Sequence, residues 1–142
     1  MKKRDDCIFC KIVMGEIPST KIYEDENVLA FLDIHPINAG HTLVIPKEHY
    51  EFIGELPLPL CGPLFDAARK ISVALRKAGF KCEAVNLHLA DGSTAGQEIP
   101  HTHLHVIPRF KGDGAGFRFP PGRRQPDVEE LKKTAETIKA NL

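Results

Sequence analysis

A chain of 142 residues is about the size of one domain and leaves room for one sizeable core. Its 19 Lys and Arg residues balance 19 Asp and Glu residues, so no net field attracts it to nucleic acid or to a membrane surface. No apolar stretch is long enough for a signal peptide or a membrane span. We therefore expect a cytoplasmic protein whose partners include neither nucleic acid nor membrane.

Two of the four cysteines, Cys7 and Cys10, are separated by only two residues, whereas Cys61 and Cys82 stand alone. In a chain without a secretory signal this pattern favours a metal site or buried thiols over a disulfide framework. The Cys-x-x-Cys spacing is half of a tetrahedral zinc site, and the other two ligands must come from distant positions.

Short β-rich runs follow at residues 21–23, 28–32 and 42–45. The breaks between them carry Glu-Asp-Glu-Asn and Pro-Ile-Asn-Ala-Gly, which are typical of turns. An antiparallel meander is the simplest arrangement of these three strands.

From Leu60 the apolar period changes to that of a helix, and the stripe ends at Gly79, a good stop residue. Residues 83–91 and 101–110 return to strand character, with a glycine-containing loop between them. Residues 110–126 are rich in glycine, proline and arginine and predict a long irregular segment. A last amphipathic helix is predicted from Asp127, where Glu130 falls in the first turn.

Three histidines alternate with other residues in "HTHLHV", residues 101–106. If residues 101–107 form a strand, His101, His103 and His105 share one face, with neighbours roughly 6–7 Å apart. The row could be the polar face of a half-exposed strand, part of a metal centre, or a nucleophilic imidazole beside a second imidazole that donates a hydrogen bond. Phosphorus is the natural target of such a nucleophile.

The pattern "HTHLHV" resembles the histidine triad of the HIT superfamily of nucleotide hydrolases and transferases. "CIFCKIVMGEIPSTKIYEDENVLAFLDIHPINAGHTLVIPKEH" resembles the N-terminal half of that family, and "AGQEIPH" its approach to the triad, so the resemblance covers residues 7–112. It implies an α+β fold in one domain over residues 1–142: a five-stranded antiparallel sheet, one long helix, and a loop and C-terminal helix in 113–142. It also implies a homodimer whose sheets join.

The resemblance further implies hydrolysis of a nucleotide through a covalent nucleotidyl-histidine. His103, the central histidine, takes the position of the nucleophile that attacks the α-phosphorus, and His105 that of a hydrogen-bond donor to the phosphate or leaving group. In the transferase branch a Gln replaces the third histidine, so His105 favours hydrolysis. The expected substrate is a purine nucleotide or AMP conjugate, and the chemistry itself needs no cofactor.

The substrate contacts are expected from the same resemblance. Asp33 takes the position of the acid that binds the ribose, although it could equally be a turn aspartate before His-Pro. His41 takes a position that supports the triad from behind. The expected base slot and phosphate loop comprise Phe9, Phe31, Ile34, Gly96, Gln97 and Glu98. The three apolar residues are as plausible as plain core.

Two positions depart from the family pattern. Ala90 stands where an Asn usually helps to hold the phosphate, and Glu98 stands where the phosphoramidate-hydrolysing branch often has Ser. A carboxylate at position 98 could act as an acid for an amine leaving group or repel a polyphosphate. The first departure removes one expected phosphate donor.

In the branch with the N-terminal Cys pair, a structural zinc is completed by the His of "PKEH" and the first His of the triad. In this chain the four implied ligands are Cys7, Cys10, His49 and His101. The alternative is two buried cysteines and two ordinary histidines. Zinc at this site would leave His103 and His105 to the substrate.

The segment after the triad carries Arg109, Lys111, Arg118, Arg123 and Arg124. It could attract the outer phosphates of a dinucleoside polyphosphate, or it could simply be solvated. "FRFPPG" resembles the C-terminal tail of the phosphoramidase branch. Three functions follow: a hydrolase of nucleoside phosphoramidates or other AMP conjugates, an asymmetric dinucleoside polyphosphate hydrolase, and a non-catalytic nucleotide-binding protein.

Overall fold

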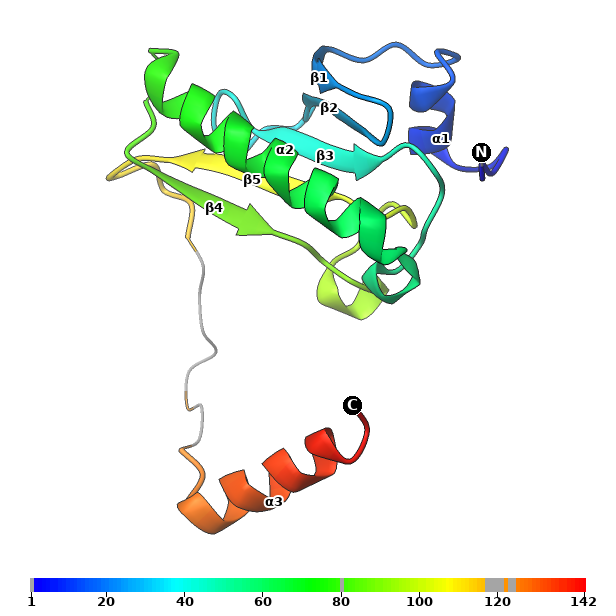
Figure 1. Ribbon diagram of the computed structural model, residues 1–142. Helices are drawn as coiled ribbons and strands as arrows, with labels where there is room; N and C mark the ends of the chain where they lie inside the picture. The colour runs from blue at the N-terminus through cyan, green and yellow to red at the C-terminus, as the bar shows by residue number, and fades with distance from the viewer. Residues whose placement is uncertain (1, 80, 117–121, 123–124) are drawn as a thin grey trace.

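A five-stranded antiparallel sheet forms the body of the protein (Figure 1). The computed structural model describes residues 2–79, 81–116, 122 and 125–142. The strands are β1 (Lys21–Glu24), β2 (Val28–Leu32), β3 (Thr42–Pro46), β4 (Ala84–His88) and β5 (Leu104–Arg109), in the spatial order β1-β2-β3-β5-β4. The first three strands form the predicted meander, β5 returns beside β3, and β4 closes the far edge. This is the α+β architecture that the resemblance implied.

The two faces of the sheet are covered by different helices. The long helix α2 (Leu58–Lys77) packs on one face, where Ala30, Val44 and Val106 are fully buried against it. The short helix α1 (Ile8–Val13) covers part of the other face, against Leu29, Phe31 and Leu43. Alternate residues of β2 and β3 therefore belong to different cores, as strand geometry requires. The rest of the second face is open.

The expected strand over residues 101–107 is wrong in its first three residues, because β5 begins only at Leu104. The backbone before it bonds to loops instead of neighbouring strands: the N–H of Thr102 donates to the carbonyl of Tyr50 at 2.7 Å. His101 is thereby turned into the interior. Only His105 of the three histidines lies in the regular strand.

The predicted helix from Leu60 begins two residues earlier, at Leu58. Pro57 and Pro59 stand at the cap and in the first turn, where a missing backbone N–H costs nothing, so these prolines start the helix instead of delaying it. Gly79 follows the C-cap with a φ of +81°, a conformation that glycine adopts without strain. Two single-turn 3-10 helices, Ile53–Glu55 and Ser93–Ala95, lie in the loops before α2 and after β4.

The predicted C-terminal helix is α3 (Val128–Lys139), which begins with a complete capping box between Asp127 and Glu130. It stands apart from the sheet and α2 in Figure 1. Val128, Leu131 and Ile138 on its apolar stripe are all exposed. Most of the Phe-Arg-Phe-Pro-Pro-Gly segment, and Arg118, Arg123 and Arg124 with it, lie outside the described residues. No helix among the described residues is long and apolar enough to cross a membrane.

Candidate active site and metal centre

A pocket of about 600 Å³ opens on the sheet face that α2 does not cover. Its lining includes nine of the residues singled out from the sequence: Phe9, Phe31, Asp33, Ile34, His41, Gly96, Glu98, His103 and His105. They come from α1, the end of β2, the start of β3, the loop before β5, and β5 itself. Gln97 does not line this pocket.

His103 lines the pocket but is itself almost fully buried, with 5% of its surface exposed. Its Nδ1 lies 2.7 Å from the carbonyl oxygen of His101, which can only accept, so Nδ1 carries the proton. Nε2 then holds a free lone pair, as a nucleophile needs. Burial lowers the pKa of His103, which favours the neutral ring. The edge of the Phe9 ring packs against it, with centroids 5.2 Å apart.

A hydrogen-bonded chain fixes the tautomer of His105. The backbone N–H of Ile37 donates to Nδ1 of His41 at 3.0 Å, so the neutral His41 ring carries its proton on Nε2. That Nε2 donates to Nδ1 of His105 at 2.9 Å. His105 therefore keeps its own proton on Nε2, where it can donate to a substrate. Burial, and then the neighbouring His103, lowers the pKa of His105 to about 4. His41 thus contacts His105 directly, and its supporting role remains a prediction.

Asp33 has two roles in the structure. Its Oδ1 accepts from the backbone N–H of His35 at 2.8 Å, which is the turn role considered from the sequence. Its Oδ2 lies 3.5 Å from Nε2 of His41, and the side chain is 18% exposed at the pocket. One oxygen thus builds the turn while the other remains at the pocket edge.

The three expected base contacts differ in exposure. Phe9 and Phe31 are buried and meet edge to face with centroids 5.5 Å apart, so they are both core and pocket wall. Ile34 is 85% exposed at the rim. The pocket therefore has a fixed aromatic wall and a solvent-exposed apolar rim.

Gln97 was expected to reach the phosphate, and in the structure its side chain bonds to the backbone at Gly92 and Glu51. Its Oε1 accepts from the N–H of Gly92 at 2.7 Å, and its Nε2 donates to the carbonyl of Glu51 at 2.8 Å. The N–H of Gly96 likewise donates to the carbonyl of Ser93. These bonds shape the loop before β5. Gly96 and Glu98 remain at the pocket wall.

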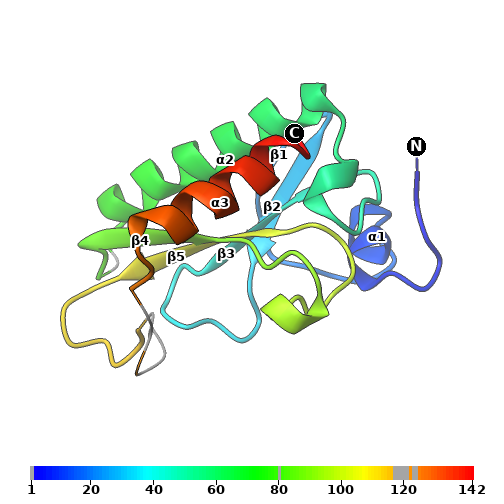
Figure 2. The same cartoon turned by 90° about the horizontal axis from the view of Figure 1, so that it is seen from below.

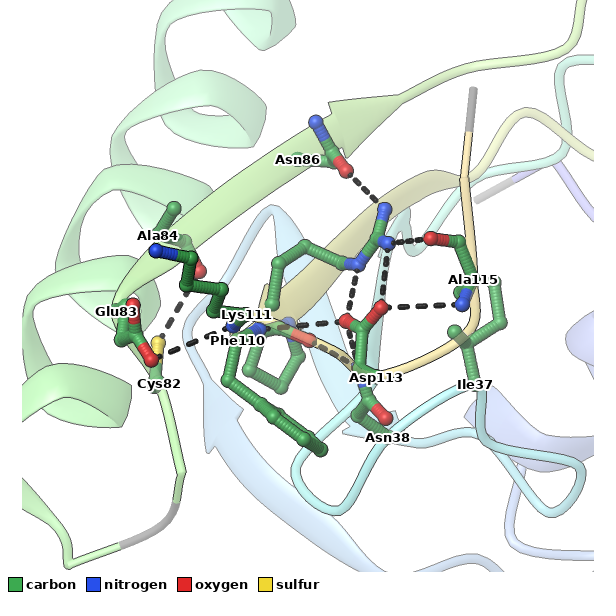
Figure 3. A network of polar contacts seen from close by, with 12 residues as sticks. Ile37, Asn38, Cys82, Glu83, Ala84, Asn86, Phe110, Lys111, Asp113 and Ala115 are labelled. Atoms are coloured by element: carbon green, nitrogen blue, oxygen red, sulfur yellow. Dashed lines mark hydrogen bonds and ion pairs between the residues drawn. The ribbon is translucent and has the colours of Figure 1, made fainter. Parts of the chain in front are cut away.

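Arg109 of the basic segment already has partners, in a polar network around Asp113, which is labelled in Figure 3. Its guanidinium forms an ion pair of 2.7 Å with Asp113, and it also donates to Asn86 and to the carbonyl of Ala115. Asn38 donates to the same carboxylate. The hydrogen bond from Arg109 is the main cause that lowers the pKa of Asp113, and the bond from Asn38 adds to it. These hydrogen bonds connect the turn after β5 to the loop before β3.

The four proposed zinc ligands, Cys7, Cys10, His49 and His101, come together in one buried cluster. One Sγ or imidazole nitrogen of each lies within 4.8 Å of all the others. The Sγ of Cys7 lies 3.3 Å from Nδ1 of His101, and the Sγ of Cys10 lies 3.4 Å from Nδ1 of His49. Such separations suit ligands around one tetrahedral ion.

The bond behind His101 supports the same assignment. Its Nε2 lies 2.9 Å from the carbonyl oxygen of Pro46 and so carries the proton, which leaves the lone pair on Nδ1 facing the cysteines. Burial lowers the pKa of His101 to about 4 and raises that of the Cys7 thiol to about 11. A second group, Asp33, His41 and His105, is also close enough for a metal, but two of its nitrogens already share a hydrogen bond.

Several residues of the pocket lining were not singled out from the sequence, among them two histidines, His35 and His88. His88 is the last residue of β4 and is exposed at the pocket. It pairs directly with His105 in the sheet, and their ring centroids are 5.6 Å apart. The sequence placed His88 in the predicted strand over residues 83–91. Only the register of β4 against β5 shows that His88 lies beside His105.

Comparison with protein families identifies this arrangement. The model of the HIT domain matches residues 14–112, which include the whole sheet and both His103 and His105. The chain belongs to the HIT family. HIT proteins of known structure have the same five-stranded sheet with helices, for example one from Bacillus subtilis with 44% identity, a TM-score of 0.89, and coverage of 97% of this chain and 98% of that one.

Other HIT relatives differ in what is known of them. An uncharacterised HIT-like protein of Borreliella burgdorferi is 46% identical over 96% of this chain and 99% of its own. An adenosine 5′-monophosphoramidase of Schizosaccharomyces pombe is 37% identical over 96% and 98% of the two chains. A zinc-bound histidine triad protein from Mycobacterium smegmatis is 38% identical, with a TM-score of 0.75 over 96% and 98%. An adenylylsulfatase of Arabidopsis thaliana is 43% identical over 78% of this chain and 55% of its own.

Proposed function

We propose that this HIT protein hydrolyses nucleoside phosphoramidates or other AMP conjugates through a nucleotidyl adduct on His103. The observation that carries the proposal is the pair of fixed tautomers in one pocket: a lone pair on Nε2 of His103 and a proton on Nε2 of His105. Relatives named as an adenosine 5′-monophosphoramidase and an adenylylsulfatase support this class of substrate.

In the proposed reaction the base lies against Phe9 and Phe31, and the ribose hydroxyls bond to Asp33. Nε2 of His103 attacks the α-phosphorus while the bond to the leaving group breaks, and the leaving group departs with that electron pair. An amine leaving group takes up a proton from solvent as it departs, whereas an oxyanion needs none. The N–H of His105 stabilises the charge on the phosphate oxygens as the transition state forms. Water then attacks the same phosphorus, releases AMP and a proton, and restores the neutral His103.

Trapping the adduct tests this proposal. Brief mixing with an AMP conjugate, followed by quenching and peptide mass spectrometry, is expected to find AMP on the peptide that contains His103. His103→Ala should lower turnover by at least about 10³-fold and still bind AMP in calorimetry. Turnover that survives in His103→Ala would rule out the covalent route.

The choice of leaving group separates the proposal from its alternative. An AMP–lysine conjugate and a diadenosine polyphosphate, supplied at equal concentration, compare the two substrate classes directly. Because Arg109 is held by Asp113, one expected contact for the outer phosphates is already engaged. We therefore expect the AMP conjugate to be the better substrate. A strong preference for the polyphosphate would reverse this order.

We also propose that Cys7, Cys10, His49 and His101 hold a structural zinc ion. The buried thiols and outward-facing Nδ1 atoms fit such an ion, and a zinc-bound relative supports it. Zinc there would tie α1 to the segment before β5. It would take no part in the reaction, since His103 and His105 use other atoms.

A homodimer that joins two sheets through β4 is the third proposal. Both β1 and β4 are edge strands, but β1 carries Lys21, Glu24 and an irregular register, which protect an edge from pairing. β4, Ala-Val-Asn-Leu-His, carries no Lys, Arg, Asp or Glu, and Leu87 is 42% exposed on it. An unprotected edge of this kind favours pairing with a second copy.

A further inference from the structure

The imidazole of His88 has no part in the reaction proposed above, although it faces the same pocket. His88 is directly opposite His105 in the antiparallel ladder between β4 and β5. Residues paired in this way project to the same face of a sheet. The ring is exposed, and its centroid lies 5.6 Å from that of His105. It is thus available to a ligand that reaches beyond His105.

The register of the sheet puts four pocket residues in one row. Phe31 pairs with Leu43, Leu43 with His105, and His105 with His88. All four line the pocket. The row therefore runs from an apolar end at β2 to two imidazoles at β5 and β4.

This order gives a direction to a bound nucleotide. With the base against Phe31 and the α-phosphate at His105, the group that departs from the phosphorus must extend toward β4 or out to solvent. His88 is the side chain that ends the row on that side. It is therefore placed to contact the leaving group and not the nucleoside.

The chemistry of this end of the pocket favours an oxyanion. An imidazole N–H donates to sulfate or phosphate oxygens, whereas Ala90, where the family pattern expects a polar side chain, offers no donor. Glu98 also lines the pocket and would repel an anion, and His88 can offset that repulsion.

We propose that His88 is a substrate-binding residue that recognises AMP conjugates whose leaving group is a small inorganic oxyanion, sulfate or phosphate, and not a second nucleotide. This inference rests on the hydrolase proposed above. Attack by Nε2 of His103 breaks the bond between the α-phosphorus and the bridging oxygen, and the leaving group departs with that electron pair as sulfate or phosphate. His88 donates a hydrogen bond to the departing anion, and no proton needs to move in this step.

The test compares two substrates that share AMP and differ only in the leaving group: adenosine 5′-phosphosulfate and adenosine 5′-phosphoramidate. His88→Ala should lower kcat/KM for the phosphosulfate by about 10- to 100-fold, the loss typical of one hydrogen bond to a charged group. It should change kcat/KM for the phosphoramidate by less than about threefold. Inhibition by AMP, which has no leaving group, should stay the same, and His88→Gln should restore part of the loss.

Asn86→Ala is the matched control, because Asn86 lies on the same strand and face, one alternate position away, and does not line the pocket. It should leave the ratio of the two kcat/KM values unchanged. The inference is overturned if His88→Ala lowers kcat/KM equally for both substrates or for neither. It is also overturned if light scattering shows that the variant acts only by changing the oligomeric state. If the wild-type protein cleaves neither substrate and forms no adduct, the proposed hydrolase function has failed instead.

Discussion

At the scale of single residues, His41 matters for the hydrogen bond that it donates to His105. It is 3% exposed, accepts from the N–H of Ile37 and donates to His105, so it sets which nitrogen of His105 carries the proton. Replacement by Phe keeps an aromatic ring but removes this donor. His105 can then place its proton on either nitrogen, and the catalytic tautomer becomes a fraction of the population.

His41→Phe should therefore lower kcat by roughly 10- to 100-fold while the affinity for AMP changes little. The unpaired N–H of Ile37 should also cost about 1–3 kcal/mol of unfolding free energy. Steady-state kinetics, AMP calorimetry and thermal unfolding measure the three quantities. An unchanged kcat would show that His105 does not depend on this hydrogen bond.

The titration of His105 makes a prediction about stability. Its pKa is lowered to about 4 in the folded protein, mainly by burial, against about 6.5 in an unfolded chain. Between these values the unfolded state binds a proton that the folded state does not, so stability falls as the pH drops from 6.5 to 4. Denaturant unfolding across this range should show a smaller fall in His105→Asn. An equal fall in both proteins would contradict it.

Spacing alone placed all three triad histidines on one face, and neither spacing nor residue type predicted which polar groups remain free. The triad spacing and the flanking motifs singled out His103 and His105, which do line the pocket. Gln97 and Arg109 instead bond to Glu51 and Asp113. Such competition between partners depends on distances in the fold, and a side chain's type alone does not reveal it.

At the scale of elements, the segment before β5 ties α1 to the sheet through the cluster of Cys7, Cys10, His49 and His101. Purified protein should contain about one zinc per chain, and Cys10→Ser should lose it and lower the melting temperature by more than about 5 °C. Cys61→Ser, at an exposed position of α2, is the matched control and should keep both. Full metal content in Cys10→Ser would exclude this ligand set.

Elements with a clear period were predicted well, and those without one were not. The meander, α2 and the capped α3 follow from alternation, an apolar stripe and a capping box. The six residues of α1 are too few to show a helical period, and β5 starts late because the backbone of Thr102 bonds to Tyr50. Local pattern does not encode a hydrogen bond between segments so distant in the chain.

At the scale of the whole molecule, the two edges of the sheet differ in their protection. Leu87→Asp puts a charge on the unprotected strand β4 and should convert the proposed dimer to monomer in analytical ultracentrifugation. Ile22→Asp is the matched control, since Ile22 is similarly exposed, at 46%, on the other edge strand. It should leave the mass unchanged. A monomeric wild type, or equal effects of both variants, would refute pairing through β4.

Figure 2 shows the chain from a second side, with β4 at the margin of the sheet and α1 near the opposite end. The proton on Nδ1 of His103 is held by the main-chain carbonyl oxygen of residue 101 and not by a side chain. A point mutation at position 101 can remove an imidazole but cannot delete that oxygen. The tautomer of His103 with its proton on Nδ1 should therefore persist when the side chains around it are substituted. Only a change in the backbone path, such as an insertion near residue 101, would abolish it.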